Sequence, residues 1–239
     1  MVLPTSKDQH QNDNLKNMLK QDFSIDNLNK QEKYRAIVDN YIDDYLKHES
    51  NSDLSKFQHD ALFPGRRLRP TLLLRLIGDK YVDVNDFRYI GVSLELFHRA
   101  SIILDDLLDD DTIRRKEPAF IIKHGNATTV LTAHYMVANA FEQLNLLVHN
   151  NRYLIQNAFS RAYKEMTISE MADLSILNAN SNFYEFYSKN VLKKTSALFN
   201  SLFTSYGVLT NQDLKTIRHL SRVGIKLGEF YQMYNDIYD

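Results

Sequence analysis

Residues 104–116 carry side chains whose type and spacing suit them to binding a divalent metal and a diphosphate. The run contains five aspartates within seven residues and then three cations. An apolar stretch of helical length precedes it, so the aspartates are expected at or near a helix C-terminus. Asp105 and Asp109 are four residues apart and share a helix face with Asp106 beside them, which suits Mg²⁺. Carboxylates crowded at the negative end of a helix repel one another, so a positive group should compensate them.

A second candidate anion site is the basic segment that runs from Gly65 to Pro70. Three arginines, Arg66, Arg67 and Arg69, surround the start of an apolar helix, and Pro70 is tolerated in its first turn. Backbone N–H groups at a helix start favour anions, and arginines bind phosphate oxygens bidentately. The segment therefore suits a phosphate, although basic turns and isolated aspartate runs are often only solvated surface features.

Oxygen-bearing side chains gather a second time near the end of the chain. Residues 232–239 read Gln-Met-Tyr-Asn-Asp-Ile-Tyr-Asp and follow an apolar stretch with helical periodicity. The chain thus places acidic groups at the C-terminal ends of two predicted helices. This repetition favours a single site to which both helix ends contribute.

The composition indicates one all-α domain. The 239 residues are 44% hydrophobic and contain only 7 glycines and 4 prolines, and no apolar stretch alternates as a strand would. Residues 1–30 are polar and are expected to form a weakly packed arm, which leaves residues 31–239 as the domain. Helices are predicted at residues 31–48, 57–63, from the basic segment through residue 74, 89–104, 127–148, 153–177, 183–206 and 212–239, with Gly207 as a helix C-cap.

Charge and cysteine content narrow the cellular setting. There is no cysteine, so disulfides and thiolate metal sites are excluded, which suits a reducing cytoplasm. The net charge of −1 gives no general attraction to nucleic acid. No apolar run approaches the length of roughly 20 residues that a membrane span needs, and the polar N-terminus argues against a secretory signal. A cytoplasmic protein without a transmembrane segment is expected.

Taken together, these motifs resemble those of the trans-isoprenyl diphosphate synthases, and the resemblance covers roughly residues 60–239. That family elongates an allylic diphosphate with isopentenyl diphosphate. The resemblance is carried, in chain order, by residues 65–70, which follow the family's Gly-Lys-Arg-x-Arg-Pro, by His98, by residues 105–109 with Arg114 and Arg115, by Lys194 and Thr195, and by Gln232 with residues 235–239.

The resemblance implies a helical bundle around a deep apolar cavity, in which two acidic helix ends hold three Mg²⁺ ions against the allylic diphosphate. It makes Asp105, Asp109, Asp236 and Asp239 metal ligands, and Asp106 a ligand or an acceptor behind them. It assigns Arg114 and Lys194 to the allylic diphosphate and Gly65, Arg66, Arg69, His98 and Arg115 to isopentenyl diphosphate. It makes Thr195 and Gln232 further substrate-binding residues. Catalysis would be mostly metal electrostatics, positioning and exclusion of water, with Asp105, Asp106, Asp109 and Lys194 as the catalytic group. A homodimer is expected from the family, and a heteromer is the alternative.

Two departures from the family pattern leave other functions open. Asn235 stands where the second acidic motif begins, and it offers an oxygen without a charge, so one metal should bind more weakly. Relatives are expected to continue beyond Asp239 through further helices. A partner-dependent or non-catalytic subunit of a heteromeric synthase is therefore one alternative. A class I terpene cyclase is another, although Arg66, Arg69, His98 and Arg115 argue for a second diphosphate substrate.

Product length is expected to depend on residues just before the first acidic run. In the family, bulky side chains four and five positions before that run form a floor that stops chain growth. This sequence has Ser101 and Ala100 there, so the floor is open, although Phe97 lies one turn deeper. The resemblance therefore implies a product of twenty carbons or more.

Overall fold

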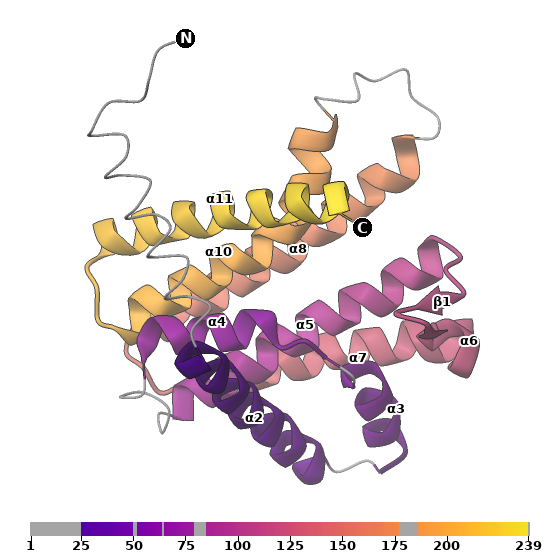
Figure 1. The fold of residues 1–239 in the computed structure, drawn as a ribbon, viewed down its shortest axis with the longest axis horizontal. Coiled ribbons are helices and arrows are strands. Elements are labelled where there is room, and N and C mark those ends of the chain that lie inside the picture. Colours follow the sequence, from indigo (N-terminus) through magenta and orange to yellow (C-terminus); the bar gives the residue numbers. More distant parts are fainter. Residues whose placement is uncertain (1–24, 50–51, 64, 79–84, 177–185, 239) are drawn as a thin grey trace.

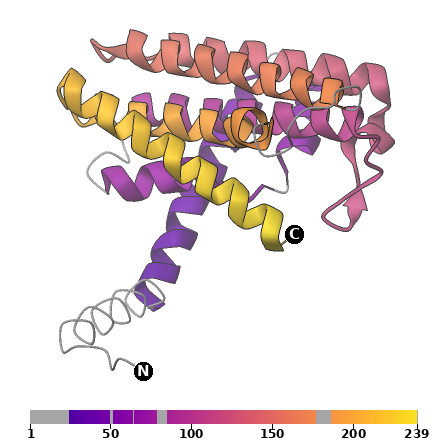
Figure 2. The same ribbon diagram turned by 90° about the horizontal axis from the view of Figure 1, so that it is seen from above.

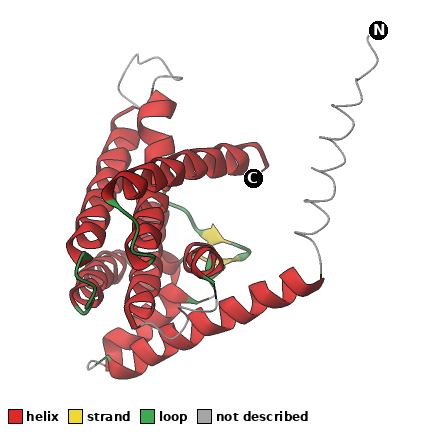
Figure 3. Ribbon diagram, turned by 90° about the vertical axis from the view of Figure 1, so that its left-hand side faces the viewer, coloured by secondary structure: helices red, strands yellow, loops and turns green. Residues whose placement is uncertain are grey.

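The computed structural model describes residues 25–49, 52–63, 65–78, 85–176 and 186–238, which are almost entirely helical (Figures 1 and 3). The elements are α2 (Ile25–His48), α3 (Ser52–Leu62), α4 (Leu68–Ile77), α5 (Asn85–Leu108), β1 (Ile113–Arg114), β2 (Glu117–Pro118), α6 (Phe120–His124), α7 (Asn126–Asn145), α8 (Arg152–Ile176), the π-helix η2 (Tyr187–Val191), α10 (Leu192–Leu209) and α11 (Leu214–Tyr238). The predicted all-α fold is confirmed.

Helix α5 forms the centre of the bundle. It packs against α2, α3, α4, α6, α7, α8 and α10. Many of its apolar side chains, including Phe87, Ile90, Leu94 and Phe97, are fully buried. A helix that is covered on several sides must be apolar around much of its circumference, and this explains the long apolar stretch before the aspartates. The same packing fixes the direction in which the C-terminal end of α5 presents its acidic side chains.

Helix α10 lies between α8 and α11 and packs closely against both (Figures 1 and 2). Its contact with α11 depends on two glycines of α11. A Cβ atom at Gly224 would lie 2.5 Å from the Phe199 carbonyl oxygen, and one at Gly228 would lie 2.5 Å from Ser196 Cα. The two backbones can therefore approach closely only because these positions carry no side chain.

This close approach gives a prediction about stability. Changing Gly228 to Ala should destabilise the fold by about 1–3 kcal/mol, because the added methyl overlaps the α10 backbone, which cannot move aside cheaply. Gly91 of α5 is a matched control, since a Cβ there would make only ordinary 3.6 Å contacts. Urea denaturation should show a loss for Gly228→Ala and no loss for Gly91→Ala. Equal stability of both variants would contradict the packing argument.

Several predicted boundaries are wrong, including the start of the second helix, which begins at Ser52 instead of Phe57, and the end of the helix predicted at residues 127–148, which stops at Asn145. The first helix begins at Ile25, before Gln31, so the proposed arm of residues 1–30 overlaps it; residues 1–24 lie outside the described part. Gly207 does not end its helix, because α10 continues to Leu209. Asn211 takes the left-handed conformation instead, with φ of 53°, and the Asn211 and Gln212 amides donate to the carbonyls of Val208 and Gly207. This is a Schellman ending with asparagine in place of glycine.

The hairpin β1–β2 was not predicted. Strand β1 pairs antiparallel with β2 through a two-residue turn at Arg115 and Lys116, whose φ angles are 52° and 68°. Such a turn normally carries Asn or Gly, which adopt positive φ at little cost, so these residues gave no hairpin signal. Within the described residues, no helix is long and apolar enough to cross a membrane.

Candidate active site

A basic cavity of about 330 Å³ brings together segments that are far apart in the sequence. It is bordered by the segment before α4, by α5, by the β1–β2 hairpin, and by α10 and α11. Its lining includes eight of the predicted substrate-binding residues: Gly65, Arg66, Arg69, His98, Arg114, Arg115, Thr195 and Gln232. Glu95 is the one acidic residue in that lining. The cavity therefore suits an anion.

Arg67 differs in role from its neighbours in the basic segment. Its side chain is fully buried, and its Nε donates to Asp39 at 2.7 Å. Its Nη1 donates to the Leu62 carbonyl at 2.7 Å and to Glu95 at 3.0 Å. A Cβ at Gly65 would overlap this guanidinium at 2.0 Å, so glycine is required there. Arg67 thus ties α2, α3 and α5 together and holds the basic segment in place.

Arg69 and His98 line the cavity, and burial lowers the pKa of each. The Arg69 guanidinium lies 5.2 Å from the centre of the Phe199 ring, and its buried Nε has no hydrogen-bond partner among the described residues. Burial, followed by the positive charges of Arg69 and Arg99, holds the pKa of His98 well below its usual range. His98 is therefore neutral at pH 7, with one ring nitrogen free to donate and the other to accept.

Two aspartates at the end of α5, Asp105 and Asp106, are paired with cations, and compensation by cations was expected. Lys194 Nζ lies 2.8 Å from Asp105 and also contacts Glu170. Arg114 binds Asp106, which is almost fully buried. Burial raises the pKa of Asp105 to about 7 despite the opposing effect of Lys194. Burial likewise raises the pKa values of Asp106 and Asp109. Lys194 does not line the basic cavity and lies on this acidic side instead.

Sequence reasoning missed two acidic residues of α8 that complete the acidic side. Glu170 contacts Lys194, and burial together with Glu170 and Asp109 raises the pKa of Asp173, although Lys194 opposes this. We call Asp105, Asp109, Glu170 and Asp173 the acidic cluster. Two acids three residues apart on a helix gave a weak signal, because such pairs are common on solvated helix faces.

Helix α10 connects the acidic cluster to the end of α11. Thr195, next to Lys194, donates its hydroxyl to Gln232, and Gln232 donates to Asp236 at 2.7 Å. Tyr187 donates to the other oxygen of Asp236. The ends of α5 and α11 lie on the same side of the molecule (Figures 1 and 2). Asn235 lines the basic cavity, whereas Asp239 lies outside the described residues.

The carboxylates at the end of α5 suit a metal that a diphosphate helps to bind. Within the described ranges, no group of three or more acidic or histidine side chains is arranged to hold a metal alone. Mg²⁺ usually takes only one or two carboxylates and completes its shell with water and phosphate oxygens. The donor set of Asp105 and Asp109 fits that mode of binding, in which a diphosphate must supply further ligands.

The raised pKa of Asp105 predicts a pH-dependent effect of substitution. The pKa of Asp105 is about 7 in the folded protein and near 4 in the unfolded chain, so between these pH values only the folded protein holds this proton. The unfolding free energy should therefore fall as pH rises through this range. Asp105→Asn removes that contribution. The stability of Asp105→Asn relative to the unsubstituted protein should therefore increase from pH 5 to pH 7.5 in metal-free denaturation curves. An unchanged difference between the two pH values would contradict the assignment.

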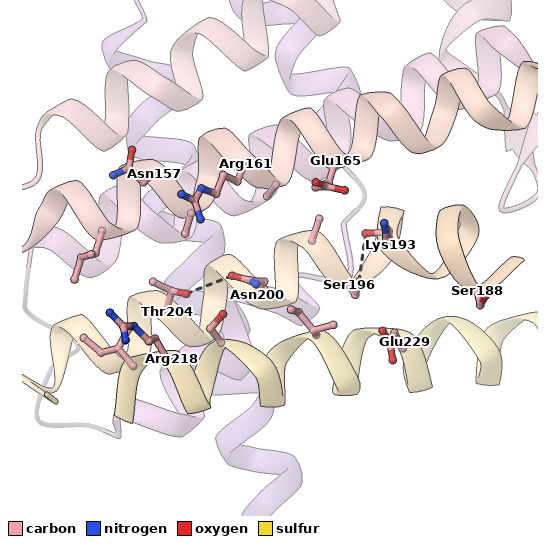
Figure 4. A pocket seen from close by; sticks show the side chains of 17 residues that line it. Asn157, Arg161, Glu165, Ser188, Lys193, Ser196, Asn200, Thr204, Arg218 and Glu229 are labelled. Atoms are coloured by element: carbon pink, nitrogen blue, oxygen red, sulfur yellow. Dashed lines mark hydrogen bonds between the residues drawn. The ribbon is translucent and has the colours of Figure 1, made fainter. Parts of the chain in front are cut away.

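A second cavity, of about 540 Å³, lies between α8, α10 and α11 (Figure 4). Its charged groups are of both signs, with Arg161, Glu165 and Arg218 around its rim. None of the predicted site residues lines it. Although it is larger, it lacks the concentration of like charge that would attract a diphosphate, and we place the candidate site at the basic cavity and acidic cluster.

Comparison with curated proteins gives relatives of one kind. The chain is 28% identical over 177 residues to the heptaprenyl diphosphate synthase component 2 of Bacillus subtilis, which covers 73% of this chain and 49% of that protein. It is 28% identical over 207 residues to a geranylgeranyl diphosphate synthase of Methanosarcina mazei, which covers 84% of this chain and 63% of the relative. The chain thus spans about half to two thirds of these relatives.

Solved structures share the fold. A geranyltranstransferase from Thermotoga maritima superposes with a TM-score of 0.78 at 24% identity, covering 87% of this chain and 78% of that one. A geranyltransferase from Legionella pneumophila gives a TM-score of 0.74 at 29% identity, covering 86% and 77%. The family model described as polyprenyl synthetase matches residues 52–239, which is most of the chain. The chain belongs to the polyprenyl synthetase family.

Proposed function

We propose that this chain is a Mg²⁺-dependent prenyltransferase that condenses isopentenyl diphosphate with an allylic diphosphate to give a longer polyprenyl diphosphate. The observation that carries the proposal is the pairing of two sites of opposite charge. A cavity rich in arginine lies beside the partly exposed acidic cluster, and α10 joins them through Lys194 and Thr195. One site suits a diphosphate directly, and the other suits a diphosphate together with metal.

The basic cavity would hold isopentenyl diphosphate. Arg66, Arg69 and Arg115 present guanidinium groups to it, and such groups bind phosphate oxygens bidentately. His98 is neutral and would donate one hydrogen bond without adding charge. Because this cavity needs no metal, its affinity should come from the arginines and His98.

The acidic side would hold the allylic diphosphate. Asp105 and Asp109 would ligate Mg²⁺ with phosphate oxygens, and Asp236 would add to the site from α11. Mg²⁺ would neutralise charge on the departing diphosphate. Lys194 already lies against Asp105, so metal binding at Asp105 would release its ammonium to contact the diphosphate. Arg114, now bound to Asp106 and Asp111, could make the same exchange.

The protein's own residues would then position the substrates and exclude water. After the allylic C–O bond ionises, the isopentenyl alkene attacks the carbocation, and the released diphosphate takes the proton that is lost. No protein nucleophile is needed, because the positioned alkene is the nucleophile. Exclusion of water would protect the carbocation from hydrolysis.

We propose a product of twenty carbons or more. Ala100, which is fully buried, and Ser101 have small side chains that would not block a growing chain beside the first acidic run. One turn deeper, the Phe97 ring packs against Phe141 and Phe159, at centroid distances of 5.0 and 5.6 Å, and would form the floor instead. The names of the relatives include heptaprenyl and geranylgeranyl diphosphate synthases, so they fix no single length.

A partner-dependent subunit is the second candidate. Two observations favour it: Asn235 removes a charge from the second acidic motif, and one relative is named as a component of a synthase. For the self-sufficient synthase we also propose a homodimer. We further propose a cytoplasmic location, with which the lack of cysteine is compatible. A terpene cyclase is less suitable, because it has no use for a second diphosphate cavity.

Product analysis tests these proposals. The purified chain is incubated with Mg²⁺, labelled isopentenyl diphosphate and farnesyl diphosphate, and the products are extracted and separated by length. Elongated products support a self-sufficient synthase and give the chain length. A folded protein that forms no product would contradict the first proposal and favour the partner-dependent subunit. A cyclic hydrocarbon formed without isopentenyl diphosphate would favour the cyclase.

A further inference from the structure

Arg99 is a cavity-lining residue to which the proposed function has given no role. It follows His98 on α5 and borders both the basic cavity and a smaller cavity that reaches Asp106 and Arg114. The residue is only 8% exposed. Its Nε donates to the carbonyl oxygen of Ala61 on α3, which fixes the plane of the guanidinium.

In the part of the chain that the structure describes, no ion pair balances the charge of Arg99. Among the arginines of the cavity, Arg67 is paired with Asp39 and Glu95, and Arg114 is paired with Asp106 and Asp111. No acidic side chain of the described residues lies within ion-pair distance of Arg99. A buried charge is costly unless it is paired, so this arrangement favours a bound anion.

The free donors of Arg99 are open to such an anion. A guanidinium has five N–H groups, and the contact with Ala61 uses one of them. Buried nitrogens without partners occur at Arg67 and Arg69 but not at Arg99, so its terminal nitrogens remain accessible. Burial lowers the pKa of Arg99 to about 10, against the effect of Glu95, and the nearby Arg115 adds to the lowering. A bound anion would offset the neighbouring positive charges and so raise the pKa of Arg99 again.

We propose that Arg99 is a further substrate-binding residue, which holds a diphosphate in the basic cavity together with Arg69 and Arg115. Its terminal nitrogens would grip phosphate oxygens bidentately, while the contact with Ala61 orients the guanidinium. The identity of the anion rests on the proposed function. The proposed role of Arg99 adds to the set of cavity arginines found by sequence reasoning.

Calorimetric titration with inorganic diphosphate tests the role of Arg99. Mg²⁺ is omitted so that only the basic cavity is probed. Arg99→Gln should raise the dissociation constant about tenfold or more, because it removes charge-assisted hydrogen bonds. Arg88→Gln is the matched control, since Arg88 lies on the same helix and borders neither cavity, and its affinity should stay within about twofold of the unsubstituted protein.

The outcomes separate this inference from the proposed function. Suppose that the unsubstituted protein binds diphosphate, that Arg69→Gln weakens this binding and that Arg99→Gln leaves it unchanged. Only the role of Arg99 is then overturned. If the unsubstituted protein binds no diphosphate, both the role and the proposed function fail. Circular dichroism verifies folding. Should Arg99→Gln not fold, Arg99→Met replaces it, because an apolar chain of similar length removes the desolvated charge, and unchanged affinity in that variant overturns the role.

Discussion

Replacing Asp105 with asparagine is expected to lower the rate of product formation by about a thousandfold, which corresponds to roughly 4 kcal/mol of lost transition-state stabilisation. Asparagine keeps the shape of the side chain but removes the charge that would bind Mg²⁺ and attract Lys194. Steady-state rates with saturating substrates and Mg²⁺ measure the effect. The stability of the same variant relative to the unsubstituted protein should rise between pH 5 and neutral pH, because the carboxyl group with the raised pKa is gone.

Asp110 provides the matched control for this change. It belongs to the same acidic run, its side chain is exposed, and its φ of 54° suits asparagine as well as aspartate. Asp110→Asn should therefore retain nearly full activity. If both variants lose activity equally, the acidic run acts through its total charge and Asp105 has no special place. If Asp105→Asn remains fully active, the proposed metal site is wrong.

Replacing Arg69 with glutamine is expected to raise the KM for isopentenyl diphosphate about a hundredfold, because two charge-assisted hydrogen bonds of about 1.5 kcal/mol each are lost. The Arg69 side chain lines the basic cavity, and its guanidinium lies against Phe199, so it is already in position for an anion. The kcat and the KM for the allylic substrate should change little, since ionisation occurs at the acidic side. Initial rates with each substrate varied in turn distinguish these parameters.

Arg75 is the control for Arg69, because it lies on the same helix, is exposed and does not line the basic cavity. Arg75→Gln should leave both KM values unchanged. A rise in the KM for the allylic substrate with Arg69→Gln, without one for isopentenyl diphosphate, would mean that the two substrates are assigned to the wrong sides.

The main site residues could be predicted from sequence because their runs are local. The acidic run and the basic segment each occupy a few consecutive residues at a helix end, and helical periodicity places such ends. The sequence also predicted that cations would compensate the aspartates, but it did not identify which residues supply them. That Lys194 provides one of them could not be derived from periodicity, because contact across 89 residues of chain depends on how α5 and α10 pack.

The roles that sequence reasoning missed all depend on tertiary contacts. Arg67 and Arg69 have the same side chain two residues apart, yet Arg67 ties the fold to Asp39 and Glu95 while Arg69 faces the cavity. Glu170 resembles any helix-surface acid until Lys194 is placed beside it. The turn at residues 115 and 116 carries side chains that disfavour positive φ, so no local rule predicts it.

The central claim is that one diphosphate binds to arginines and the other binds through metal. The most direct measurement is calorimetric titration of isopentenyl diphosphate and of a non-ionising thiolo analogue of farnesyl diphosphate, each with and without Mg²⁺. We expect isopentenyl diphosphate to bind in both conditions and the farnesyl analogue to bind only when Mg²⁺ is present. Strong binding of the farnesyl analogue without Mg²⁺, or an absolute Mg²⁺ requirement for isopentenyl diphosphate, would contradict this account.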